Sequence, residues 1–464
     1  MPRQIAIFGG SFNPPGLHHR LIAEQLVQEF DEVVVVPCGP RPDKPTTNDV
    51  DPVHRATLTD IAFHDLAKTR VELFDLEQAT FTRTDELDAR FSGHGELWHV
   101  VGTDFTTGGA QGESVIQTKW EGGAEMWNSL NFLVVARRGI PARPEDLPPR
   151  SRVIQLDSPQ DDASSSIREK IFKRESYAQL MLPEVAHYIE RYGLYRGRIP
   201  SRTTLLDLSE PRVLIYADET NERAREWTEK LRPWENSEQP NCIVAVGGDG
   251  TMLQAIRRHW RRRIPFLGLN AGHLGFLLNQ PEALFNRTFS PGELVARQMP
   301  MLYVEMEKEC GSTESTLAFN DAWVERATSQ SAWLEVSVND RVRIQKLVGD
   351  GVLVSTAAGS TAYARSMGCQ PLLADTPGWL IVGSNVLDPP AWKSALLSTE
   401  THVRVRNLSE DKRPVDAFVD GRAHGRVRTM SARLSRIAAP ELAFRAEHDT
   451  AEKIALIQFP SSDG

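Results

Sequence analysis

The sequence predicts an α/β protein of two domains, the second of which ends in a mainly β part. Near the N-terminus, an apolar strand at 4–8, a helix with apolar residues spaced by four and a buried strand at 33–36 follow one another with short connections. This order implies a parallel βαβ unit. A fresh strand at 212–216 begins a second α/β pattern. After residue 300 short strands of alternating hydrophobicity replace it and helices become scarce, which predicts β structure.

Three further segments carry specific expectations. Residues 108–123 are rich in glycine and polar side chains, so we expect a long mobile loop. Apolar residues alternate on either side of Asn339-Asp340 within 334–344, which predicts a hairpin with a two-residue turn. The range 198–210 is rich in proline, serine and threonine, and we expect a linker there.

Composition limits the classes of function. The 464 residues carry a net charge of −9, which argues against a general affinity for nucleic acid. The four cysteines lie far apart, so neither a disulfide framework nor a zinc site is expected. No apolar run is long enough to cross a bilayer, and the N-terminus enters a strand directly. We therefore expect a cytoplasmic protein with small-molecule partners and neither a nucleic-acid nor a membrane partner.

The chain is organised around a glycine-rich turn that contains one carboxylate. The apolar strand at 243–246 leads into Gly247-Gly-Asp-Gly-Thr251, whose glycines allow positive φ, and a helical pattern follows. Backbone N–H groups at a helix N-terminus bind phosphate well. Asp249 would be repelled by that phosphate unless a metal ion or a proton-transfer role compensates. The turn therefore indicates chemistry, although a simple structural turn is the alternative.

A second stretch gathers hydroxyl groups around a glycine about a hundred residues later. Ser355, Thr356, Ser360, Thr361 and Tyr363 surround Gly359 between a strand and a predicted helix. Small hydroxyl residues with glycine are typical of a polar ligand pocket. The structural alternative is a capped helix start.

Four motifs in one order resemble those of the NAD kinase family. They are Gly247–Thr251, Asn270–Leu277, Phe319–Asp321 and Asp350–Tyr363, although Ala357-Ala358 stand where the family often has Pro-Thr. The resemblance covers 211–464. It implies the NAD kinase fold, with an α/β part at 211–300, a mainly β part at 301–464, an active site between them and a homo-oligomeric assembly.

The resemblance also implies roles for individual residues. Asp249 would be the general base that removes the proton from the 2′-hydroxyl of NAD, and ATP would donate the phosphoryl group. Mg²⁺ would be held by the nucleotide phosphates, not by a protein site. Phosphate would lie against Gly247, Gly248 and Thr251. NAD would be bound by Asp249, Gly250, Phe276, Asn320, Asp321, Asp350, Thr361, Ala362, Tyr363 and Ser366.

The first strand of the chain also ends in a glycine turn. Gly9-Gly-Ser-Phe-Asn-Pro-Pro-Gly-Leu-His-His19 lacks the G-x-G-x-x-G spacing, which disfavours a Rossmann dehydrogenase. His18 and His19 lie where the turn becomes a helix. Beside glycine N–H groups, two imidazoles could neutralise phosphate charge, although a histidine at an arbitrary helix start is more often a surface residue.

This stretch resembles the signature of the nicotinate/nicotinamide mononucleotide adenylyltransferase family, Gly-Gly-(Ser/Thr)-Phe-(Asp/Asn)-Pro-Pro-His-x-Gly-His. His19 matches the last histidine, Gly16 stands where the first belongs, and His18 replaces the glycine. We hypothesise that His18 substitutes for the first histidine. The resemblance covers 1–197 and implies a Rossmann-like nucleotidyltransferase domain.

Other matches to this family follow in order. Ser164 and Ser165 begin a helix that contains Arg168, and serine caps with an arginine fork suit phosphate. Trp120 or Trp127 would stack on the pyridine ring. ATP phosphates would be bound by Gly9, Gly10, Ser11, Phe12, His18, Lys44, Ser164, Ser165 and Arg168, with His19 as the catalytic residue. The mononucleotide would be bound by Arg55, Asp104 and Trp120.

Three functions are compatible with these observations. The first is a bifunctional enzyme that makes the dinucleotide from a mononucleotide and ATP and then phosphorylates NAD. The second is an NAD kinase with an inactive, regulatory first domain, which Gly16 favours. The third is a lipid kinase, which shares the Gly-Gly-Asp-Gly-Thr turn, but Asn320-Asp321 and Gly359–Tyr363 argue against it. The fusion favours the nicotinamide mononucleotide, whereas the family often prefers the nicotinate form, so the sequence leaves both open.

Overall fold

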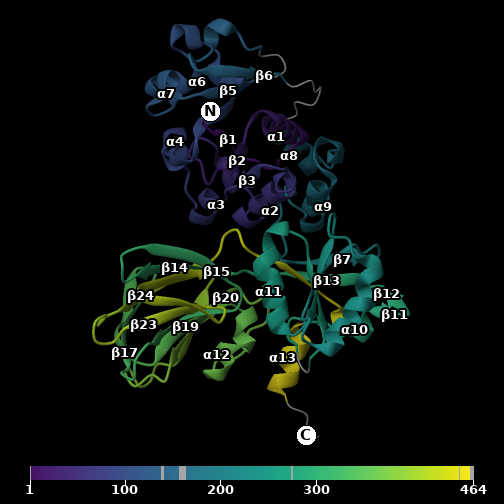
Figure 1. Cartoon of the computed structure of the whole chain (residues 1–464), viewed down its shortest axis with the longest axis vertical. Coiled ribbons are helices and arrows are strands. Elements are labelled where there is room, and N and C mark those ends of the chain that lie inside the picture. Colours follow the sequence, from purple (N-terminus) through teal and green to yellow (C-terminus); the bar gives the residue numbers. More distant parts are fainter. Residues whose placement is uncertain (1, 137–140, 156–162, 273–274, 449, 460–464) are drawn as a thin grey trace. The chain divides into compact units, whose positions relative to one another are not determined.

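The computed structural model describes residues 2–136, 141–155, 163–272, 275–448 and 450–459 (Figure 1). The chain forms two compact units, Met1–Pro200 and Ser201–Gly464. Within the described residues, no helix has the length and apolar character that a membrane crossing needs. The fold is mixed α/β, as the sequence predicts.

Unit 1 contains a six-stranded parallel sheet in the order β3-β2-β1-β4-β5-β6. The chain moves outward from β1 in one direction and then from β4 in the other, so the switch point lies between these two strands. Ligands of open parallel sheets bind outside the carboxyl ends at such a point. The strands are β1 (Gln4–Gly10), β2 (Glu32–Pro37), β3 (Thr69–Val71), β4 (Glu96–Gly102), β5 (Phe132–Val135) and β6 (Ser151–Ile154).

Helices connect these strands and cover the sheet. They are α1 (Leu17–Glu29), α2 (Pro52–Phe63), α3 (Phe74–Gln78), α4 (Thr84–Phe91), α5 (Thr103–Thr106), α6 (Val115–Lys119), α7 (Gly123–Ser129), α8 (Ser164–Lys173) and α9 (Pro183–Tyr192). The prediction of a long loop at 108–123 is wrong, because α6 and the start of α7 lie in this range. Ser114 caps α6 by accepting from Gln117 N, and the fully buried Ile116 packs with Trp127.

Unit 2 begins with a mixed six-stranded sheet in the order β7-β13-β25-β10-β9-β8. The strands are β7 (Thr203–Leu208), β8 (Val213–Ala217), β9 (Cys242–Gly247), β10 (Phe266–Asn270), β13 (Gly292–Gln298) and β25 (Glu441–Phe444). Side chains alternate between the faces of β9: Val244 packs toward α10 (Glu222–Leu231), and Ile243 packs with Met252 and Ile256 of α11 (Asp249–His259). The two helices therefore cover opposite faces.

Two elements of this sheet correct the expected boundaries. The range 198–210, expected as a linker, contains β7, which pairs antiparallel with β13 along its whole length. It is an edge strand whose Leu205 is 62% exposed, so it lacks the apolar run of a buried strand. The range 301–464, expected to be mainly β, returns to the α/β part through β25 and α13 (Thr450–Gln458).

Unit 2 also contains a two-stranded antiparallel sheet of β11 (Phe285–Asn286) and β12 (Thr288–Phe289) and an antiparallel β structure of eleven strands. The expected hairpin is confirmed. The loop after β19 forms the short helices η9 (Ala358–Thr361) and α12 (Tyr363–Ser366). The strands are β14 (Leu302–Lys308), β15 (Thr313–Ala318), β16 (Asp321–Arg326), β17 (Ala332–Val338), β18 (Arg341–Gly349), β19 (Gly351–Ser355), β20 (Gly378–Ser384), β21 (Ser394–Ser398), β22 (His402–Asn407), β23 (Val415–Val419) and β24 (Arg422–Leu434).

Candidate functional site

The glycine turn of unit 2 joins the buried strand β9 to helix α11, and Asp249 is the first residue of that helix. The expectation of positive φ is wrong for Gly248, whose φ is −106°. A steric contact explains the glycine at position 247. A Cβ on Gly247 would lie 2.3 Å from Thr251 Oγ1, whereas the space beside Gly248 and Gly250 is open. The backbone of these two residues is therefore accessible to a ligand at the helix N-terminus.

The carboxylate of Asp249 is held by backbone amides of a distant segment. Its Oδ2 accepts from Phe276 N at 2.9 Å, and its Oδ1 accepts from Leu277 N at 3.0 Å. Burial raises the pKa of Asp249 above its usual range, and the two amides and the charge of Lys453 act in the opposite direction. A fixed carboxylate whose pKa is shifted toward neutrality is suited to accept a proton.

Asn320 and Asp321 are positioned by Asp420, a residue that the sequence reasoning missed. The Asp420 carboxylate accepts from the amides of Phe319, Asn320 and Asp321 at 2.9, 2.8 and 3.2 Å. Burial and the nearby Asp420 raise the pKa of Asp321 to about 7. In the sequence, Asp420-Gly421 looks like an ordinary turn between two strands, and it is one, with φ values of 44° and 76°.

The hydroxyl-rich loop is packed against the same Asn320 segment. Thr356 Oγ1 donates to Phe319 O at 2.7 Å, and Ser355 Oγ donates to Asn320 O at 3.2 Å. A Cβ on Gly359 would lie 2.1 Å from Asn320 O. The buried hydroxyls of Ser355 and Thr356 therefore hold the loop in place and do not line a ligand pocket, which corrects the expectation for these two residues.

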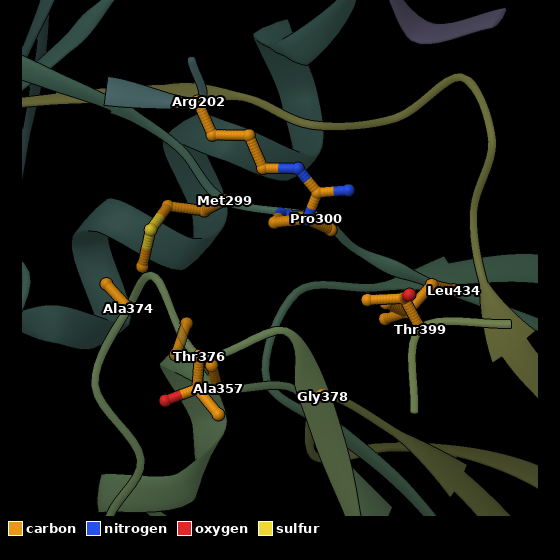
Figure 2. Close-up of a pocket in the computed structure, with 10 residues that line it drawn as sticks. Arg202, Met299, Pro300, Ala357, Ala374, Thr376, Gly378, Thr399 and Leu434 are labelled. Carbon is orange, nitrogen blue, oxygen red and sulfur yellow. The ribbon is translucent and has the colours of Figure 1, made fainter. Parts of the chain in front are cut away.

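Two adjoining pockets lie where this loop meets the α/β part. One brings Phe276 and Leu277 together with Thr361 and Ile454, which places the loop beside the segment that holds Asp249. The second pocket, shown in Figure 2, is lined by Arg202, and the side chain of Met299 extends toward Ala374. The residues common to both are Met299, Ala357, Ala358 and Ala374.

The remaining predicted NAD contacts lie around α12. Tyr363 is 38% exposed and packs edge-on against Trp323, with ring centroids 5.1 Å apart. Ala362 precedes α12, and Ser366 Oγ donates to Tyr363 O at 2.7 Å. Asp350 is already engaged, because its oxygens accept from Arg326 Nε at 2.5 Å and Asn385 Nδ2 at 2.7 Å.

In unit 1, the turn after β1 is built tightly around an aromatic ring. Phe12 is fully buried and has a φ of 41°. A Cβ on Gly10 would lie 3.0 Å from the Phe12 ring, whereas the space beside Gly9 is open. Phe12 also packs edge-on against His19, with centroids 5.1 Å apart, so it shapes the site as a buried support.

The two histidines at the start of α1 lie ring against ring at a tilt of 40°, with ring centroids 3.8 Å apart. His19 Nδ1 accepts from Gly16 N at 3.1 Å. A Cβ on Gly16 would lie 2.9 Å from His18 Nδ1. The His18 imidazole thus occupies the space into which a side chain at position 16 would extend.

Cationic side chains surround the loop after β1. Lys44 Nζ donates to Ser11 Oγ at 3.0 Å, and Arg168 Nη1 donates to Asn13 O at 2.6 Å. Burial lowers the pKa of Lys44, and Arg41, Arg168 and Arg55 act in the same direction. This accumulation of positive charge favours an anionic ligand.

Arg55 is not placed as the predicted mononucleotide contact. It is 1% exposed, and its Nη2 donates to Ser11 O and Cys38 O, both at 2.7 Å. Its Nη1 donates to Thr47 O at 3.2 Å. The guanidinium therefore ties together the loops that carry the site, because a buried charge needs such partners.

The other predicted residues of unit 1 lie at helix ends. Ser164 Oγ donates to Pro14 O at 2.9 Å at the start of α8, and Ser165 beside it is exposed. Asp104 lies in α5, directly after β4. Trp127 is buried in the core, whereas Trp120 is half-buried, with its ring centroid 5.9 Å from that of Phe105. Of the two tryptophans, Trp120 is therefore the more accessible.

Comparisons with known proteins identify relatives of both units. Residues 204–289 match the family model described as ATP-NAD kinase N-terminal domain, and residues 7–170 match the cytidylyltransferase-like model. The NAD kinase of Rickettsia bellii is 30% identical over 248 residues, which cover 53% of this chain and 97% of that protein. The NAD kinase of Brucella suis is 34% identical over 227 residues, covering 48% and 86%. The crystal structure of yeast NADH kinase complexed with NADH aligns with a TM-score of 0.47 at 19% identity, covering 57% of this chain and 92% of that one.

Proposed function

Since the chain belongs to the NAD kinase family through its second unit and carries a cytidylyltransferase-like domain in its first, we propose that it is a bifunctional enzyme of NADP synthesis. The second unit would transfer the γ-phosphoryl group of MgATP to the 2′-hydroxyl of NAD. The first unit would transfer an adenylyl group from MgATP to a pyridine mononucleotide. When the mononucleotide is the nicotinamide form, the dinucleotide made by the first reaction is NAD, the substrate of the second.

The observation that supports the kinase activity best is the environment of Asp249. Its carboxylate is fixed by two amides beside a pocket that reaches Thr361, and burial raises its pKa. In our proposal it accepts the proton of the attacking hydroxyl. The open backbone of Gly248 and Gly250 at the N-terminus of α11 then holds phosphate.

Recognition of the dinucleotide would fall to the segment that Asp420 positions. Among the described residues, the buried Asn320 Oδ1 has no hydrogen-bond partner. A buried acceptor of this kind gains free energy when a ligand supplies a donor. We propose that an amino or amide N–H of the dinucleotide donates to it, while Tyr363 packs against the ligand from α12.

The adenylyl transfer would proceed by direct displacement. The 5′-phosphate of the mononucleotide attacks the α-phosphorus of ATP, and the bond to pyrophosphate breaks. Lys44, Arg168 and the paired imidazoles His18 and His19 would stabilise the charge that develops on the phosphoryl oxygens. The position of His18 beside Gly16 supports this activity over the alternative, in which the first unit only binds nucleotide.

Purified protein with MgATP tests both activities. NAD, a lipid acceptor and each of the two mononucleotides are supplied separately, and products are resolved by chromatography. We expect NADP from NAD and a dinucleotide from at least one mononucleotide. The lipid acceptor should not be phosphorylated. Asp249→Asn should abolish NADP formation while leaving NAD binding, and retained turnover would rule out the base. Fractionation and light scattering test the cytoplasmic location and the homo-oligomer that we also propose.

A further inference from the structure

The C-terminal helix α13 reaches the segment that holds Asp249. Lys453 on this helix is only 9% exposed, and its Nζ donates to Phe276 O at 3.2 Å and also to Leu278 O. The next residue, Ile454, lines the pocket that contains Phe276 and Thr361. The end of the chain is therefore part of the wall of the candidate kinase site.

One peptide group connects Lys453 to Asp249. The carbonyl of Phe276 accepts from Lys453, and the N–H of Leu277, which belongs to the same peptide group, donates to Asp249 Oδ1 at 3.0 Å. A cation on the oxygen polarises a peptide group and strengthens its N–H as a donor. The cation and the carboxylate thus act on opposite ends of one rigid unit.

Two other charged groups on the elements around Asp249 have partners of their own. On α11, Arg257 lies eight residues further along, about 12 Å of helix, and its Nη2 is 3.6 Å from Asp420 Oδ2. After β8, Asp218 accepts from Thr220 Oγ1 at 2.6 Å. Of the charged groups in the described part of the chain, Lys453 is the one that lowers the pKa of Asp249.

We propose that Lys453 is a positioning residue of the kinase reaction: through the Phe276–Leu277 peptide group it fixes the carboxylate of Asp249 and keeps it in the anionic form that accepts a proton. This inference rests on the proposed role of Asp249 as the base. It assigns a function to the C-terminal helix, which none of the sequence motifs includes.

Three substitutions separate the charge of Lys453 from its hydrogen bonds. Lys453→Arg keeps both, Lys453→Gln keeps donors without charge, and Lys453→Met removes both. We expect the acid limb of log(kcat/KM) against pH to move up by about one pH unit in the Gln and Met variants. Along the acid limb, at pH values below the wild-type midpoint, NADP formation would then fall about tenfold, whereas on the alkaline plateau it would be unchanged. The Arg variant and the exposed control Glu452→Gln on the same helix should keep the wild-type profile.

A double-mutant cycle tests the connection without relying on activity. We expect Lys453→Met to lower the urea midpoint of unfolding more in the wild-type background than in the Asp249→Asn background. If wild-type protein makes no NADP but the cycle shows this coupling, the proposed function fails and the connection stands. An active enzyme whose acid limb is unmoved in both the Gln and Met variants, or a cycle without coupling, would overturn the inference. If the Met variant does not fold, the Gln variant replaces it in both measurements.

Discussion

Moving the missing histidine of the first unit back to position 16 is the sharpest test of how that unit works. The substitution Gly16→His returns the first histidine of the family signature, leaves His18 where the signature has glycine, and meets an occupied space. A Cβ there would lie 2.9 Å from His18 Nδ1 and 3.0 Å from Ile167 Cδ1. Contacts below 3.0 Å force neighbours to move, and overpacking of this kind costs about 1–3 kcal/mol. We therefore expect the single variant to be less stable and no more active than the wild type.

The double variant Gly16→His with His18→Gly should behave differently, because the imidazole at position 18 is gone and only Ile167 Cδ1, at 3.0 Å, remains close to the new Cβ. We expect it to recover the urea midpoint and to form dinucleotide within about tenfold of the wild type. His18→Ala alone should keep the fold and lose about 10²–10³-fold in dinucleotide formation, the range for removal of one donor to a developing oxyanion.

The assay follows dinucleotide from mononucleotide and MgATP by chromatography, with the urea midpoint measured in parallel. Asp249→Asn serves as the matched control, since it alters the other unit and should leave this reaction unchanged. Full activity of His18→Ala would refute the reasoning. So would a single Gly16→His variant that is both as stable as the wild type and more active.

Three further predictions concern buried charges. Asp420→Ala leaves three buried amides without an acceptor, so urea unfolding should show a loss of about 3 kcal/mol, together with weaker NAD binding by calorimetry. Burial raises the pKa of Asp321 in the folded state to about 7. The ionised carboxyl therefore destabilises the fold fully above pH 7. This destabilisation is absent below the ordinary pKa of an aspartate, where the carboxyl is protonated in both states. Asp321→Asn should therefore raise stability by up to about 4 kcal/mol at pH 8 and by little at pH 4, as urea titrations at the two pH values would show. Arg55→Met should destabilise unit 1 by at least about 3 kcal/mol in the same titrations, because three buried carbonyls lose their donor.

The elements that sequence reasoning predicted well are those with a local signal. The run from β9 through the glycine turn into α11 and the hairpin at Asn339-Asp340 depend on residues close together in the chain. By contrast, β25 inserts between β13 and β10 from the far end of the chain, and no local pattern marks such a pairing. The sequence predicts a loop around Ser114 because glycines are frequent there, and the short helix that Ser114 caps has little local signal.

The residues of the candidate site likewise divide into those with a local sequence signal and those without one. Asp249 is recognisable because a single carboxylate in a glycine-rich turn at a helix N-terminus is chemically unusual. The groups that hold it are backbone amides of Phe276 and Leu277, which have no side-chain signature, and a lysine 177 residues from its carbonyl partner. The sequence predicts Arg55 as a ligand contact, because sequence alone does not distinguish an arginine that binds carbonyls from one that binds phosphate.

The place of β25 inside the first sheet of unit 2 bears on how the protein is synthesised. Until residues 441–444 emerge from the ribosome, β10 and β13 each present an open edge, and open edges pair with other chains. A nonsense codon ahead of residue 441 would release a polypeptide with both edges unprotected. Loss of β25 would then produce aggregation instead of a slightly shortened enzyme.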